Sequence, residues 1–239
     1  MDTTKRPDDW VPLHLHTHYS LLDGLSHPKQ VAERCVELGY STCAITDHGT
    51  ISGAVAFTKA MKDVAIKPIL GCEFYITSDV SIKDKEHRSL SHLVVLAKNQ
   101  NGWLGLIEAT SASNEPENYY FKPRLDLKSL SEYAQGNLVA FSGHLGSDLA
   151  NILFTDWRAA YNASTETGVK SYIRKDWVEQ ATRVVREHQS VFGEENFFIE
   201  IQLIDQENSP AAKIVGEGLR YIARLLDVAP VATADSHYP

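Results

Sequence analysis

The sequence predicts an α/β fold in which seven strand–helix units form a barrel. Apolar strand-like runs alternate with helix-like runs along the 239 residues, a pattern typical of parallel βα units. Potential ligand residues also gather at the strand ends, as in barrel active sites. Seven units are one fewer than in the common eight-stranded barrel, and an open doubly wound sheet is the alternative. The predicted strands are Val11–His16, Thr42–Asp47, Pro68–Ile76, His92–Ala97, Leu138–Ser142, Phe197–Gln202 and Pro230–Asp235.

Helix signals occupy several of the intervening segments. Ser26 is a good N-cap for a helix with an apolar stripe that ends at Gly39. A second apolar stripe runs from Trp177 to His188, and Ser209-Pro210 opens the last predicted helix. These helices would cover the outside of the strands.

Two segments lack such signals and are predicted to be loops. Asp79–Ser89 is charged, and Thr155–Ser171 is polar with little periodicity. The first residues are polar as well, so we expect a polar tail over residues 1–10 and a single domain over residues 11–239.

The composition indicates a globular protein that we expect in the cytoplasm, without a membrane partner. Hydrophobic residues make up 43% of the chain and charged residues 23%. No apolar run approaches the ~20 residues that span a membrane, and the N-terminus has no signal-peptide pattern. The three cysteines, Cys35, Cys43 and Cys72, are predicted to be reduced core residues. The net charge of −8 argues against a generic basic nucleic-acid surface, but bound cations could supply local positive charge.

Histidines at alternate positions near the N-terminus are the first chemical signal. In a strand, His14 and His16 would project to one face, about 7 Å apart, and could hold one metal ion. His18 continues this spacing but lies beyond the predicted strand end, so we expect it to face the surface or a substrate. His27, His87 and His188 are predicted to be ordinary surface residues.

Further potential ligands stand at the ends of the other predicted strands. Six of the ten histidines occupy such positions, and the strand ends of a parallel barrel meet on one face. Imidazole and carboxylate ligands without thiolate suit Zn, Mn or Fe. The number of candidate ligands is larger than one ion needs, so we expect more than one ion. The candidates are His14, His16, His48, Glu73, His92, His144, Asp235 and His237.

Five short runs resemble the motifs of the polymerase and histidinol phosphatase (PHP) family. They are His14–His16, Thr46–Gly49, Gly71–Glu73, Ser142–Gly146 and Asp235–Tyr238. The similarity is greatest to the branch formed by the N-terminal PHP domains of bacterial replicative DNA polymerase III alpha subunits. The runs similar to that branch are Ser20–Gly24, Lys67–Gly71, Leu96–Asn99 and Lys122–Arg124, and the resemblance extends from about Leu13 to Tyr238.

The resemblance implies a distorted (β/α)7 barrel that holds three divalent metal ions at the C-terminal ends of its strands. His14, His16, Glu73 and Asp235 would bind one ion, and Asp23, His48 and His237 a second. His92 and His144 would bind a third, with Glu73 as a bridge. Ligand-type residues stand at all nine positions.

The resemblance also implies a metal-dependent phosphoesterase, with a 3′–5′ DNA exonuclease of the proofreading type as the leading hypothesis. Its substrate would be a single-stranded or frayed 3′ end, and other replisome components are possible partners. Arg124 and His18 are candidate substrate-binding residues, and Asp47 would orient a ligand imidazole. The domain could be free-standing or the N-terminal part of a polymerase. Two alternatives remain open: a non-catalytic scaffold of the polymerase, and a small-molecule phosphomonoesterase of the histidinol phosphatase type.

Overall fold

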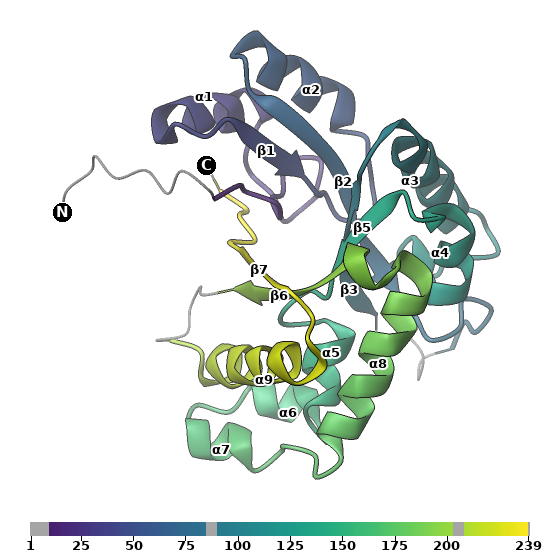
Figure 1. Ribbon diagram of the computed structural model, residues 1–239, viewed down its shortest axis with the longest axis vertical. Coiled ribbons are helices and arrows are strands. Elements are labelled where there is room, and N and C mark those ends of the chain that lie inside the picture. The colour runs from purple at the N-terminus through teal and green to yellow at the C-terminus, as the bar shows by residue number, and fades with distance from the viewer. Residues whose placement is uncertain (1–9, 85–89, 203–207, 239) are drawn as a thin grey trace.

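A computed structural model describes residues 10–84, 90–202 and 208–238, in which one mixed sheet curls into a half-barrel (Figure 1). The strand order is β1-β2-β3-β5-β6-β7, and the short strand β4 pairs with β2. The strands are β1 Thr42–Ile45, β2 Lys67–Ile76, β3 Ser91–Ala97, β4 Arg124–Leu125, β5 Leu138–Phe141, β6 Phe197–Gln202 and β7 Pro230–Thr233.

The predicted first strand, Val11–His16, does not form a regular strand. Leu15 makes an isolated parallel bridge to Ser236, and the N–H of Ala44 donates to the carbonyl of Pro12. The segment therefore lies between β1 and the chain that follows β7. Pro12 has no N–H to donate to a neighbouring strand, which works against a regular strand here. The observed architecture is a curled half-barrel, and the complete barrel of seven units is not confirmed.

Strand β3 departs from the expected parallel arrangement. It is antiparallel to both β2 and β5, while the other neighbouring strands are parallel. The described part of the β2–β3 connection, residues 77–84, contains no helix, and a parallel crossover usually needs one. His92, near the start of β3, consequently pairs with Tyr75, near the end of β2. This reversal brings an N-terminal strand end to the edge where the parallel strands finish.

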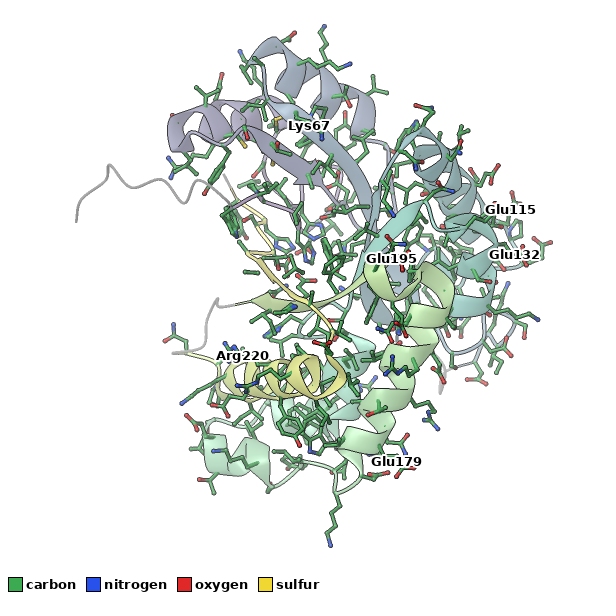
Figure 2. The ribbon with its side chains drawn as sticks, viewed as in Figure 1. Lys67, Glu115, Glu132, Glu179, Glu195 and Arg220 are labelled. Carbon is green, nitrogen blue, oxygen red and sulfur yellow. The ribbon has the colours of Figure 1, made fainter. Side chains whose placement is uncertain are left out.

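Helices lie outside the curled sheet, with α1 and α2 beside β1 and β2, and α8 and α9 beside the later strands (Figure 1). They are α1 Pro28–Leu38, α2 Ala54–Asp63, α3 Gln100–Ser113, α4 Leu127–Ala134, α5 Asp148–Ile152, α6 Trp157–Tyr161, α7 Glu166–Lys170, α8 Trp177–Phe192 and α9 Pro210–Leu226; a 3-10 turn covers Glu194–Asn196. Exposed carboxylates such as Glu132 on α4 and Glu179 on α8 point outward from them (Figure 2).

The helix ends agree closely with their sequence signals. Gly39 ends α1 with a φ of 73°, and the Ser209 side chain accepts the N–H of Ala212 at the start of α9. The N-cap of α1 is His27 instead of the predicted Ser26, a shift of one residue.

The two predicted loops differ in outcome. Thr155–Ser171 contains the short helices α6 and α7, whose first turns are capped by the side chains of Asp156 and Thr165. Single-turn helices are too short to show periodicity, which explains the wrong prediction. Asp79–Ser89 is irregular as far as Asp84, and residues 85–89 lie outside the described residues. The predicted polar tail also lies outside them, except for Trp10.

The core lies between the sheet and the outer helices. The three cysteines are free and buried, as predicted. His188 was expected at the surface, but it is buried on α8 and its Nδ1 bonds the carbonyl of Val184. Within the described ranges, no helix has the length and apolar character needed to cross a membrane.

Candidate metal centre

Two imidazoles and two carboxylates converge beside the sheet edge. The Nε2 atoms of His14 and His16 lie 3.1 Å apart. Glu73 Oε2 is 3.6 Å from the first and 3.2 Å from the second, and Asp235 Oδ1 is 3.2 Å and 3.4 Å from them. The set is the one expected for the first ion, and we call it the His14 cluster.

Hydrogen bonds on the far side of each ring set the proton positions. His14 Nδ1 donates to Glu200 Oε1 at 2.7 Å. His16 Nδ1 contacts Ser20 Oγ at 2.9 Å, and that hydroxyl gives its own hydrogen to Asp47 Oδ1 at 2.8 Å. The Ser20 oxygen must therefore accept from His16, so both Nδ1 atoms carry the proton. In the neutral rings both Nε2 lone pairs face the same point.

A divalent cation fits that point. Two converging lone pairs repel each other unless a positive charge lies between them. Four ligand atoms at ~2.0–2.1 Å from a tetrahedral ion are separated by roughly 3.3 Å, close to the spacing of the His14 cluster. Glu73 Oε2 and Asp235 Oδ1 are buried without a hydrogen-bond partner, which is costly unless a cation satisfies them.

The electrostatics of the His14 cluster also favour a cation. Burial lowers the pKa of His14, but the carboxylates of Glu200, Glu73 and Asp235 together raise it by more than burial lowers it. The net pKa of His14 therefore lies well above the ordinary value. Burial raises the pKa of Asp235, but His14 and His16 bring it down to about 2. The carboxylates thus stay ionised and attract positive charge.

A second group is built around Asp23. Its Oδ2 lies 2.7 Å from His48 Nε2 and 3.1 Å from His237 Nε2. His237 Nδ1 donates to the carbonyl of Asp235 at 2.9 Å, so its Nε2 lone pair is also available. The residues expected for the second ion are therefore brought together.

Glu73 connects these groups with His92. Its Oε2 lies 2.7 Å from His48 Nδ1, and its Oε1 lies 2.9 Å from His92 Nδ1. Burial raises the pKa of Glu73, yet its contacts with the imidazoles, led by His14, hold it well below the ordinary value. Such a buried, ionised carboxylate between several imidazoles suits the expected bridging role.

His144 stands apart from the other candidates. It joins none of the ligand groups that the described residues form, which are His14–His16–Glu73, His16–His48–His237 and His48–Glu73–His92. Only 3% of it is exposed, and neither ring nitrogen has a hydrogen-bond partner of normal geometry. Burial lowers its pKa and favours the neutral ring. Its expected partnership with His92 stays a prediction.

The residues that orient the ligands were only partly predicted. Asp47 was expected to orient a ligand imidazole, and this role stays a prediction. Its carboxylate accepts the hydroxyl hydrogen of Ser20, whose oxygen contacts His16 Nδ1 and accepts the N–H of His48 at 3.1 Å. Glu200 was not among the candidate residues, although it holds the ring of His14 through a hydrogen bond to Nδ1. A carboxylate in an apolar strand is costly to bury unpaired. The position of Glu200 in the apolar strand β6 could therefore have indicated that it has a partner such as His14.

Two predicted substrate-binding residues lie elsewhere. Arg124 is fully buried, and its guanidinium donates to the carbonyls of Asn118, Ile82 and Val80. The expectation that it contacts phosphate is wrong, because its donors hold the chain around β4 together.

His18 turns away from the ligand groups. Its ring lies against Tyr19 and His27, with centroid distances of 4.3 Å and 4.2 Å. A role in binding substrate stays a prediction for this residue.

Local backbone geometry helps to bring the chain termini into the centre. Asp235 has a φ of 47°, which is unusual for a residue other than glycine. The turn places Ser236 beside the N-terminal segment, where its carbonyl accepts the N–H of His16 at 2.8 Å. Gly24 is required because a Cβ there would lie 2.1 Å from the carbonyl oxygen of Thr17.

The PHP domain family model matches residues 12–203. The chain belongs to the PHP domain family. Its relatives include DNA polymerase III alpha subunits from Helicobacter pylori, 34% identical over 95% of this chain, and from Treponema pallidum, 33% identical over 96%. The same subunit from Thermus aquaticus is 34% identical over 95%. The chain spans only 17–18% of the length of these relatives.

Two solved structures share the fold. An amidohydrolase from Chromobacterium violaceum, with bound sulfate and no metal, superimposes with a TM-score of 0.55 at 14% identity, over 96% of this chain and 88% of its own. A candidate metal-dependent phosphoesterase from Bifidobacterium adolescentis gives a TM-score of 0.50 at 14% identity, over 98% and 89%. At this identity the likeness concerns the fold alone.

Proposed function

We propose that this chain is a metal-dependent phosphoesterase that hydrolyses DNA from the 3′ end, as a free-standing protein or as the PHP domain of a DNA polymerase III alpha-like protein. Its relatives are alpha subunits of a DNA polymerase, and this relationship favours DNA as the phosphodiester substrate. A 3′–5′ exonuclease of the proofreading type, working beside other replisome components, is the specific activity that we propose.

One observation carries the hydrolytic part of the proposal. The Nε2 atoms of His14 and His16 face each other at 3.1 Å, with two buried carboxylate oxygens beside them. Imidazole and carboxylate are the ligands that Zn, Mn and Fe take in hydrolytic sites. Divalent ions held there would lower the pKa of an attacking water and stabilise charge on the phosphoryl oxygens.

The ligand residues fall into the three sets that we propose for three ions. His14, His16, Glu73 and Asp235 form the first set, Asp23, His48 and His237 the second, and His92 and His144 the third, with Glu73 shared. Glu200 adds a fourth carboxylate in contact with the first set. Three dications would still outweigh four carboxylates, so the loaded site would attract a phosphate diester, whereas the carboxylates alone would repel it.

The protein's own groups hold this arrangement in place. Glu200 fixes the ring of His14 by a hydrogen bond and itself accepts a hydrogen bond from the hydroxyl of Thr233. Asp47 holds Ser20, which in turn orients His16. Rigid ligands of this kind retain their geometry when substrate enters.

Degradation of 3′-labelled single-stranded DNA in the presence of Mn²⁺ tests the proposal. We expect release of mononucleotides from the 3′ end, and we expect His48→Ala to abolish it. Tyr221→Ala is the control, because Tyr221 is an exposed aromatic residue on α9 that does not belong to the candidate ligands. Unchanged activity in His48→Ala would contradict the assignment of that residue and indicate a contaminating nuclease.

The same preparation separates the alternatives. Hydrolysis of p-nitrophenyl phosphate without DNA degradation would favour a small-molecule phosphomonoesterase. Absence of both activities in a fully metallated protein would favour a scaffold role.

A further inference from the structure

A cavity of about 680 Å³ adjoins the metal centre, and no part of the proposed mechanism uses it. His48 lines both the cavity and the second ligand group. The remaining walls come from the chain before and after Gly49, from α3, and from the segment Tyr119–Pro123 that leads into β4. A molecule bound at the ligands would therefore extend into this space.

Tyrosine and phenylalanine side chains form part of the walls of the cavity. Tyr19, Tyr75, Tyr119 and Phe121 all line it. Tyr75 lies almost parallel to His48, with an interplanar angle of 18° and a centroid distance of 5.7 Å, and it meets His92 edge-on. The cavity thus begins at an aromatic surface that is in contact with two candidate ligands.

The charge of the cavity is opposite to that of the whole chain. The chain carries a net charge of −8, yet the described residues that line the cavity include Lys122 and no carboxylate. Lys122 Nζ donates to the hydroxyl of Tyr75 at 2.8 Å. An ammonium has three hydrogens, so two donors can still serve an anion.

Large apolar side chains are displayed at the rim. Phe121 is 61% exposed and has a φ of 61°, and Leu21 is 83% exposed. A left-handed backbone is strained at a residue with a side chain. Strained, exposed apolar residues beside a polar centre are typical of a binding surface.

From this arrangement we infer that the cavity binds a base of single-stranded DNA that directly flanks the scissile phosphate. The base would stack on the aromatic walls, and Lys122 would contact the backbone phosphate. Aromatic walls with a nearby cation are the usual means of holding single strands. The inference rests on the proposed function, because it places the scissile phosphate at the ligand groups.

Oligonucleotides that lack one base test the inference. One has an abasic residue at the 3′ terminus, one at the penultimate position, and a control has it several nucleotides upstream. Binding is measured by fluorescence anisotropy with Mn²⁺ on oligonucleotides whose last linkages are hydrolysis-resistant phosphorothioates. Hydrolysis is measured with Mn²⁺ on oligonucleotides with ordinary phosphodiester linkages. Base–aromatic stacking predicts that loss of a flanking base weakens binding by roughly 5- to 150-fold, whereas the upstream change has little effect.

Matched variants show whether the cavity is responsible. In Phe121→Ala, the ratio of the dissociation constants for abasic and intact ends should fall to near one. Tyr221→Ala, which removes another exposed aromatic ring far from the lining, should leave it unchanged. Lys122→Gln should weaken binding to all oligonucleotides. The slope of log affinity against log salt concentration should also become shallower, by the amount that corresponds to about one phosphate contact.

The outcomes distinguish the two proposals. Equal binding and hydrolysis of intact and abasic ends by the unmodified protein would overturn the base site, as would discrimination that survives in Phe121→Ala. If discrimination between intact and abasic ends is seen in binding while no DNA is hydrolysed with Mn²⁺, the base site stands and the nuclease proposal fails.

Discussion

The Nε2 atoms of His14 and His16 lie 3.1 Å apart although Glu200 and Ser20 hold the proton of each ring on the opposite nitrogen. The pKa of His14 lies well above its ordinary value, so a proton on its Nε2 relieves this opposition when no ion is bound. A metal cation held by both rings would replace that proton. Such a cation would also explain why the buried oxygens of Glu73 and Asp235 find no hydrogen bond.

Removal of one imidazole should remove metal. We expect His16→Ala to lose at least one equivalent of bound metal per chain, because one lone pair of the His14 cluster disappears. His18→Ala should keep the full complement, since His18 lies outside the cluster. Elemental analysis of metal-loaded protein after gel filtration measures both, and a fully metallated His16→Ala would contradict the first site.

Loss of the charge behind His14 should weaken the same site without unfolding the protein. Glu200→Gln keeps the shape of a fully buried side chain but no longer supports the ring with a negative charge. Groups that orient a ligand typically contribute 10–100-fold to metal affinity, and we expect a loss of about that size in a Zn²⁺ competition titration. Glu195→Gln, at an exposed site, is the control. Equal affinities in the two variants would argue against a supporting role for Glu200.

Arg124 should matter for stability and not for catalysis. Arg124→Met leaves three partly buried carbonyls without their charged donor, which should cost about 2–4 kcal/mol of unfolding free energy. Urea unfolding measures this loss, and the KM for DNA of the folded fraction should not change. A stable variant with a greatly raised KM would restore the phosphate-binding role that the sequence suggested.

The N-cap of α4 should make stability depend on acid pH. Burial raises the pKa of Asp126, but the N–H groups of Ser129 and Val80 lower it more, and the net pKa lies below 3.8. The stabilisation is therefore present above about pH 4 and is lost as the pH falls through the lower folded value. Asp126→Ala should cost ~1 kcal/mol at pH 7.

Unfolding in urea at pH 7 and at pH 3 checks this dependence. The difference between Asp126→Ala and the unmodified protein should shrink at the lower pH. An exposed carboxylate on α2, changed in Asp63→Ala, provides the comparison. A cost of Asp126→Ala that is the same at both pH values would show that the charge is not responsible.

Strain at Leu22 should be relieved by glycine. Leu22 has a φ of 68° and its side chain is fully exposed, so Leu22→Gly loses little contact and removes a left-handed strain. We expect a gain of up to about 1 kcal/mol. Leu21→Gly is the matched control, because Leu21 does not have a positive φ, and it should be neutral or destabilising. Thermal unfolding of both variants is sufficient, and a destabilised Leu22→Gly would refute the strain.

Several parts of the site could be predicted because they depend on local sequence. The apolar runs are enough to place Glu73 within a strand and Asp235 at a strand end. In the structure Glu73 lies in β2, and β7 ends at Thr233, two residues before Asp235. The resemblance to the PHP family then added Asp23, which by spacing alone is a turn residue before Gly24. The structure places Asp23 beside His48 and His237 and places Asp235 beside His14 and His16, whereas His144 has no such contact with the other candidates among the described residues.

The remaining features could not be predicted from local patterns. A strand has the same periodicity in either direction, so nothing in Ser91–Ala97 itself shows that β3 is antiparallel. The same holds for Arg124, whose partners lie up to 44 residues away in the sequence. Long-range pairing of this kind is decided when the segments pack.

The sequence by itself determined the family, most strand positions and the chemical nature of the site, because these follow from side-chain type and spacing. Only the tertiary structure decided that the sheet is a half-barrel, that Glu200 supports His14, and that an aromatic cavity opens beside His48. Each of those features arises where segments distant in the chain meet, and the free energy of such contacts depends on how they fit together.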